Sequence, residues 1–87
     1  MRPACTIVLA TSVHDGKGYA EALGIEEFRI GTPLNASSLE GLITRAVVVT
    51  PRFAILLVRE SLDPDSRARR VFDTANRNAM HSGAPRG

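Results

Sequence analysis

The residues best suited to chemistry stand directly after three apolar stretches of this chain. Each stretch ends in a threonine, Thr11, Thr32 or Thr50, and a helix-starting sequence follows each of them. If the stretches are parallel strands, the three hydroxyls lie at one edge of a single sheet, where open α/β sheets usually bind ligands. The pattern therefore suggests, as the alternative to a non-enzymatic interaction module, a site for a small ligand, a nucleotide or a phosphate formed by Thr11, Ser12, Lys17, Thr32, Thr50 and Arg52.

The loop after the first stretch lacks a complete phosphate-binding motif. A Walker A loop has a glycine upstream of its Gly-Lys pair and a hydroxyl residue after the lysine. Here the upstream glycine is missing, and Gly18 follows Lys17. A dinucleotide fingerprint fails as well, because Glu21 stands where its third glycine belongs. We therefore interpret His14 to Gly18 as an ordinary turn between strand and helix, with phosphate binding as the alternative.

One pair of neighbours, His14 and Asp15, has the side chains for acid-base catalysis. No nucleophile accompanies this pair at a recognisable spacing, since Ser12 is two residues away and Cys5 lies at the far end of the strand. The chain also has no Cys/His spacing typical of a zinc site. The sequence therefore predicts no catalytic residue, no metal site and no cofactor.

The elements that would position these residues are strands alternating with helices. The stretches lack polar alternation, which is typical of strands covered on both faces. Such an alternation predicts a small three-stranded parallel sheet with helices on both faces and a C-terminal helix, a Rossmann-like half in the α/β class. The expected strands are Cys5 to Val13, Phe28 to Thr32 and Ala46 to Val49, with a short helix over Tyr19 to Leu23 that Gly24 ends.

The strand order follows from which stretch is least apolar. The second stretch is the shortest and carries Arg29, so we expect it at an edge, and the wholly apolar first and third stretches become neighbours. This order, 2-1-3, makes Thr11 and Thr50 flank a topological switch point. The alternative order, 3-2-1, would place the strand of Arg29 in the centre of the sheet and has no switch point.

Three further helices are predicted after the second strand. Asn35 or Ser37 caps a helix within Pro33 to Leu42, and Thr50 caps another that opens with a proline. The apolar run from Phe53 to Val58 suits a buried strand as well as a helix, but the Thr-Pro start favours helix. A last helix is expected from Asp63-Pro64 onward.

The last helix carries three arginines on the face opposite its apolar stripe. Phosphate groups could be bound by Arg67, Arg70 and Arg77, so one hypothesis is weak nucleic-acid binding. Asp73 stands four residues from both Arg69 and Arg77, a spacing that forms ion pairs and partly neutralises the patch. No aromatic residue accompanies these arginines for base stacking, so we favour a solvated helix face.

The apolar run in the preceding helix is longer than one buried face requires. The apolar residues beyond those needed for one buried face either pack in the core or contact a partner. A domain of 87 residues buries a modest share of its surface, so self-association would add to its stability. We therefore expect a homo-oligomer, most simply a dimer, with Phe53, Ile55, Leu56 and Leu57 as the candidate contact residues.

Length and composition restrict the remaining possibilities. The chain fits one domain over residues 1–81 with a loose tail over 82–87, and its hydrophobic content of 44% is ordinary for a globular fold. The single cysteine, Cys5, excludes an intramolecular disulfide, and no apolar stretch is long enough for a membrane. Ten arginines against the one lysine indicate codon usage in a GC-rich genome. We expect a cytoplasmic protein.

The strand-Thr-Pro-helix pattern, the Ala/Arg-rich composition and the sequence Ala75-Asn76-Arg77-Asn78-Ala79 resemble small uncharacterised α/β proteins encoded by phages of actinobacteria. The resemblance implies a non-enzymatic accessory protein of the host cytoplasm that binds a host or phage protein. It supplies no catalytic residues.

Overall fold

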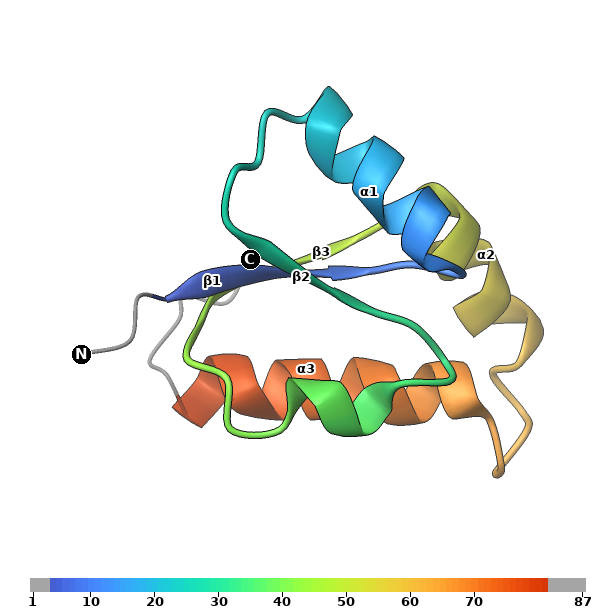
Figure 1. The fold of residues 1–87 in the computed structure, drawn as a ribbon. Coiled ribbons are helices and arrows are strands. Elements are labelled where there is room, and N and C mark those ends of the chain that lie inside the picture. The colour runs from blue at the N-terminus through green and yellow to red at the C-terminus, as the bar shows by residue number, and fades with distance from the viewer. Residues whose placement is uncertain (1–3, 82–87) are drawn as a thin grey trace.

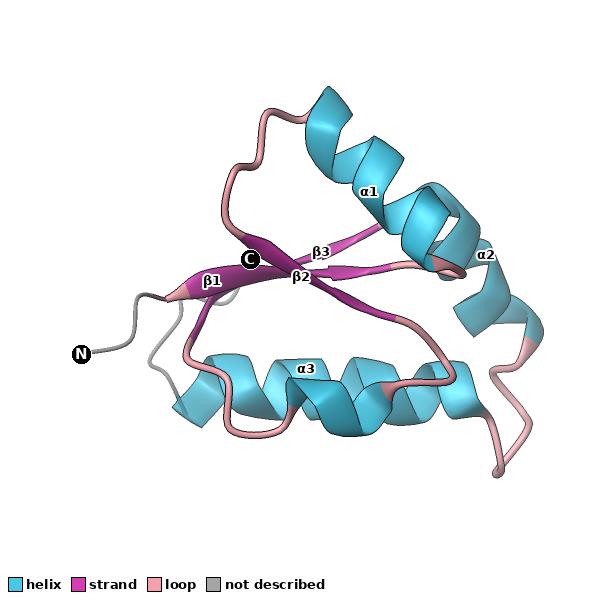
Figure 2. Cartoon of the chain, viewed as in Figure 1, coloured by secondary structure: helices cyan, strands magenta, loops and turns pink. Residues whose placement is uncertain are grey.

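The structure, a computed structural model, describes residues 4–81 and has the expected α/β architecture (Figure 1). A parallel sheet of three strands lies in the middle, in the order β2-β1-β3. This confirms the predicted order and places the first and third strands side by side. Figure 2 shows the strands in magenta between layers of helix. Their bounds are β1 Cys5–Leu9, β2 Phe28–Gly31 and β3 Thr44–Val49.

Helices cover the two faces of the sheet unequally. Helix α1 lies on one face, against β1 and β2, while α3 and a short 3-10 helix, η1, lie on the other (Figure 1). Helix α2 stands at the carboxyl ends of the strands and contacts α3. The ambiguous apolar run is therefore a helix, as favoured. The bounds are α1 Val13–Ala22, η1 Ala36–Leu39, α2 Pro51–Arg59 and α3 Arg67–His81.

The main core lies between the sheet and α3. Ile7 and Leu9 point to this face from β1, and Val47 and Val49 point to it from β3, because each pair shares a register position. The long α3 contributes an apolar stripe at helical spacing. The fully buried members of this core are Ile7, Leu9, Leu39, Phe53, Ala68, Val71 and Ala75.

The first helix begins earlier than its glycines suggested. The predicted turn from His14 to Gly18 was wrong, because these residues belong to α1. Ser12 caps the helix by accepting a hydrogen bond from the backbone N–H of Asp15 at 3.1 Å. Gly16 is required for packing rather than for a turn: a Cβ atom there would lie 2.8 Å from Cγ2 of Ile30. Gly24 ends the helix region with a φ of +71°, in agreement with its predicted role.

Two other helix predictions needed correction. The expected helix within Pro33 to Leu42 is only one 3-10 turn, because the Asn35 side chain accepts a hydrogen bond from the N–H of Thr32 and closes a turn instead of capping. The last helix begins at Arg67 rather than after Asp63. Asp63 accepts from the N–H of Asp65 in a local turn, and Ser66 provides the first helical acceptor, for Arg69.

Across residues 4–81, the structure contains no helix that is both long enough and apolar enough to cross a membrane. The predicted tail, residues 82–87, lies outside the described part of the chain.

Candidate functional site

The two helices α1 and α2 begin side by side, at the adjoining carboxyl ends of β1 and β3. Ser12 caps α1, and the hydroxyl of Thr50 caps α2 by accepting from the N–H of Phe53 at 3.2 Å. The N–H of Thr50 continues the pairing between β3 and β1 by donating to Leu9 at 2.9 Å. The predicted capping role of Thr50 is confirmed, and the switch point lies between the strands where it was expected.

Asp15 joins these two helix starts. Its Oδ2 atom accepts hydrogen bonds from the Thr50 hydroxyl at 2.8 Å and from the backbone N–H of Thr11 at 3.1 Å. The Thr11 hydroxyl adds a longer bond of 3.3 Å. Since the Thr50 hydroxyl also accepts from Phe53, a single hydroxyl ties the start of α2 to the first turn of α1.

The environment of Asp15 favours its ionised form. Burial alone raises the pKa of this carboxyl, but the hydrogen bonds from Thr50 and Thr11 and the positive charge of Arg52 outweigh it, and the pKa lies below its ordinary value. Helix N-termini attract anions because their N–H groups and dipoles point outward. Here the Asp15 carboxylate already places a negative charge at the two helix starts. This charge disfavours the binding of a phosphate at the same place.

The structure separates the predicted ligand-binding residues into two groups. Thr11, Ser12 and Thr50 come together around Asp15, whereas Thr32 is buried at the end of β2 in its own turn, where its hydroxyl accepts from the N–H of Leu34. Arg52, although exposed, lies close enough to Asp15 for its charge to lower the pKa of that carboxyl, whereas Lys17 is exposed without a place in this cluster's hydrogen bonds. Sequence reasoning missed Asp15 as the centre of this cluster. The signal was the spacing of Ser12 and Asp15, which matches a capping box.

The predicted contact residues of α2 also divide. Phe53 is completely buried in the core, so it cannot contact a partner, and its assignment to an interface is corrected. Leu56 and Leu57 are half-buried against the same core. Only Ile55, at 59% exposure, faces solvent.

Two further apolar residues are exposed after Ile55 in the chain. Val58 is 74% exposed and Leu62, in the turn after α2, is 95% exposed. Ile55 and Val58, three residues apart, lie on one side of α2, and Leu62 is exposed in the turn that follows the helix. We call Ile55, Val58 and Leu62 the α2 stripe. The spacing was visible in the sequence, but the predicted interface stopped at Leu57.

The segment that carries Leu62 is held in place by polar contacts. The hydroxyl of Ser66 donates to Oε1 of Glu60 at 2.7 Å and accepts from the N–H of Arg69 at 3.1 Å. These bonds tie the end of α2 to the start of α3. The apolar stripe is therefore presented by a fixed part of the structure, a property that lowers the entropic cost of binding.

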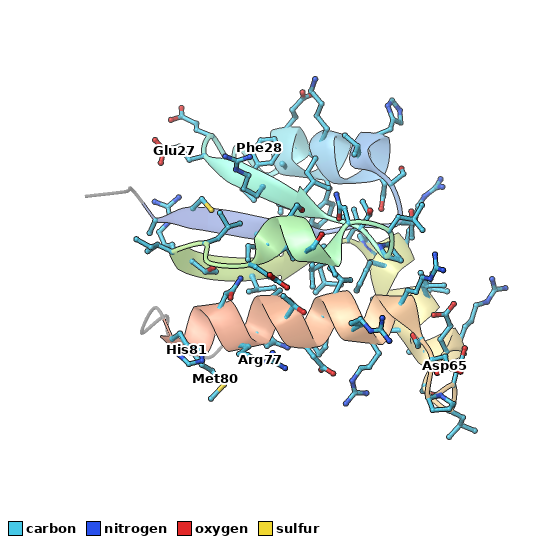
Figure 3. All side chains as sticks on the ribbon, turned by 60° about the horizontal axis from the view of Figure 1, so that its bottom comes forward. Glu27, Phe28, Asp65, Arg77, Met80 and His81 are labelled. Atoms are coloured by element: carbon cyan, nitrogen blue, oxygen red, sulfur yellow. The ribbon has the colours of Figure 1, made fainter. Side chains whose placement is uncertain are left out.

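The arginines of α3 do not form one patch. Arg67 and Arg70 line a shallow hollow of 410 Å³ between α3 and the segment around η1, and Glu40 lines it too. Arg77 lies near Met80 and His81 at the other end of the helix from Asp65 (Figure 3). Of the two ion pairs that the spacing suggested, residues 4–81 form the one between Arg69 and Asp73, at 3.2 Å. This dispersion weakens the case for phosphate binding along the helix.

Comparisons with known proteins find no match for this chain among protein-family models, curated proteins or solved structures. Its function must be argued from its own residues.

Proposed function

We propose that this protein is a non-enzymatic interaction module that associates with a second copy of itself. The observation that carries the proposal is the α2 stripe. Ile55 and Val58 project from the side of α2 opposite Phe53, and Leu62 is exposed in the turn just after the helix, so this region has an apolar surface besides the one that serves the core. Exposed apolar residues that lie together, rather than singly, mark interaction surfaces.

A two-fold arrangement suits such a surface. In an isologous dimer the same stripe is contributed by both copies, so apolar residues meet apolar residues without any other partner. Full burial of a valine, leucine or isoleucine side chain stabilises by about 1.5–3 kcal/mol. The charged neighbours Arg52 and Arg59 are exposed beside the stripe and would form its polar rim.

The test is a charge placed in the stripe. Val58→Glu should leave the fold intact, because the side chain is largely exposed, but should lower the association constant at least about tenfold, since a carboxylate would be buried at the contact. Light scattering after size-exclusion chromatography, over a range of concentrations, measures this. Gly18→Glu is the matched control: it adds the same charge to α1, where a new side chain meets open space. Equal masses for wild type and Val58→Glu would refute the role of the stripe.

Two other functions stay predictions from the sequence. A ligand at the carboxyl ends of the strands would have to use Thr11 and Thr50 while they bind Asp15. Nucleic-acid binding would depend on arginines that lie at two ends of α3. The phage-type resemblance, with its accessory role in a host cytoplasm and a host or phage partner, is likewise a proposal.

A further inference from the structure

The outer edge of β3 is open. In the sheet order β2-β1-β3, β3 has β1 on one side and, within residues 4–81, no strand on the other. Backbone groups alternate in direction along a strand. The N–H of Thr50 points to β1, so Val48 and Ala46 also direct their backbone groups to β1. The N–H and C=O groups of Val47 and Val49 therefore point outward, where they can pair with another extended chain.

Within residues 4–81, one face of β3 is only partly covered. Ala46 and Val48 share register positions with Thr6 and Val8, so they point to the face on which α1 lies. Helix α1 packs mainly against β2 and β1. Thr6 and Val8 are buried, whereas Ala46 and Val48 remain half-exposed.

We propose that β3 pairs antiparallel with β3 of a second copy, which would join two sheets into one of six strands. The inference rests on the proposed self-association, but it uses a surface distinct from the α2 stripe. The edge supplies backbone donors and acceptors together with a half-exposed apolar row, and these are the groups that strand addition uses.

The register of β3 favours its own copy as the occupant. A two-fold axis beside Val47 brings the outward groups of Val47 in the two copies together as a hydrogen-bonded pair. It also sets Ala46 of each copy opposite Val48 of the other, so that the half-exposed apolar residues cover one another. Arg45, the single charged residue of β3, lies at the register irregularity between Thr44 and Ala46, near Val49 of the other copy and at the end of the regular pairing. The two Arg45 residues stand about 13 Å apart along the strands, so like charges do not meet.

Amide hydrogen exchange of the wild-type protein tests the pairing directly. The N–H groups of Val47 and Val49 should gain at least about tenfold protection when the concentration is raised through the association range. Ala46 and Val48 are internal controls, since their N–H groups bond to β1 and should be protected at every concentration. Exchange at Val47 and Val49 that stays fast in the associated protein would overturn the proposal.

Charge pairs test the register. The background is Val58→Glu, so that the α2 stripe does not hide the result. Adding Ala46→Lys or Val48→Glu should lower the remaining association about tenfold, because each puts one charge beside an apolar residue. Carrying both substitutions should restore it, since the register places the new lysine of each copy opposite the new glutamate of the other. Circular dichroism and urea unfolding confirm that each variant is folded.

The outcomes separate this proposal from the proposed function. If wild type and Val58→Glu have equal masses but respond to Ala46→Lys, the α2 stripe fails and the β3 pairing stands. If Val58→Glu is monomeric at every concentration while wild type associates, the β3 pairing is wrong and the stripe stands. Absence of rescue in a folded double variant overturns the pairing in this register. A monomeric wild type overturns both.

Discussion

The two strands that flank β1 differ in how well their outer edges are protected against pairing with another chain. Strand β2 has four residues, contains Arg29, and is followed closely by Pro33. Strand β3 has six residues, and from Ala46 to Val49 it is wholly apolar. Short length, charge and proline are the usual means by which proteins keep an edge strand from pairing with other chains. The chain applies all three at the β2 edge, whereas within residues 4–81 the β3 edge has Arg45 and a register irregularity at that residue, both confined to the start of the strand.

The two strands also differ in packing, since β2 is packed more closely than β3. On the β2 side, Gly16 lets α1 approach Ile30, and on the opposite face Gly31 lets the sheet approach Leu39, where an added Cβ would lie 2.9 Å from Cδ1. Strand β2 is thus held closely from both faces. Within residues 4–81, strand β3 is packed closely by α3 on one face, while on the other face Ala46 and Val48 are half-exposed. In this small sheet the β2 half is completed within the chain, while the β3 half keeps surface for association.

The largest effect is expected from breaking the close packing of the β2 half. Gly16→Val should lower the free energy of unfolding by about 3 kcal/mol, the upper range for overpacking, because its Cβ would clash with Ile30 and would lie 3.1 Å from Cβ of Ala10. Urea unfolding followed by circular dichroism measures the change.

Gly18 supplies the matched control for this prediction. It lies two residues further along the same helix, and an added Cβ there meets nothing within 4 Å. Gly18→Val should be close to neutral, because valine and glycine differ little in helix propensity. Equal effects at the two positions would show that close packing against β2 is not what requires Gly16.

An intermediate effect is expected at the junction between α1 and the end of β3. Thr50→Val removes the cap of α2 and the hydrogen bond to Asp15, and it should cost about 1–2 kcal/mol at pH 7. Unfolding in urea at several pH values measures this cost and shows how much of it depends on the charge of Asp15.

The direction of the pH dependence follows from the pKa of Asp15, which is lowered in the folded protein. Ionised Asp15 favours the folded state, so its contribution is complete above the ordinary aspartate pKa of about 3.9. It is lost as the pH falls through the lower pKa of the folded protein. The difference between wild type and Thr50→Val should therefore narrow below that ordinary value. In Thr74→Val, which loses a hydroxyl bonded to a backbone carbonyl, the difference should stay constant with pH.

These comparisons show how far the sequence alone could predict the molecule. The strand order followed from local facts, because Arg29 in a short stretch marks an edge. The α2 helix followed from Thr50 and the proline after it. The start of α1 was missed, because two glycines within five residues resemble a turn when their neighbours in space are unknown. The need for glycine at position 16 of α1 is visible only beside Ile30, a residue of strand β2.

The candidate surfaces were harder to predict for the same reason. A run of apolar residues does not say which of them face the core, so Phe53 was taken for a contact residue and Val58 was overlooked. Likewise, Asp15 was paired with its neighbour His14, whereas its structural partner is Thr50, 35 positions away in the chain. Local spacing predicted the elements, but only the packing between them shows which side chains remain available.

The smallest effect is expected from removing the charge at the β2 edge. Arg29→Val makes this strand wholly apolar, and since Arg29 is exposed the stability should change by no more than about 0.5 kcal/mol. The effect on pairing is measured by light scattering in a chain that also carries Ala46→Lys and Val58→Glu. There, Arg29→Val should raise the association constant less than about threefold, because the four residues of β2 offer few outward backbone groups. That result would mean that the short length of β2 is enough to protect its edge. A dimer as stable as the one proposed for β3 would instead show that the charge of Arg29, and not the short length of β2, keeps the β2 edge from pairing.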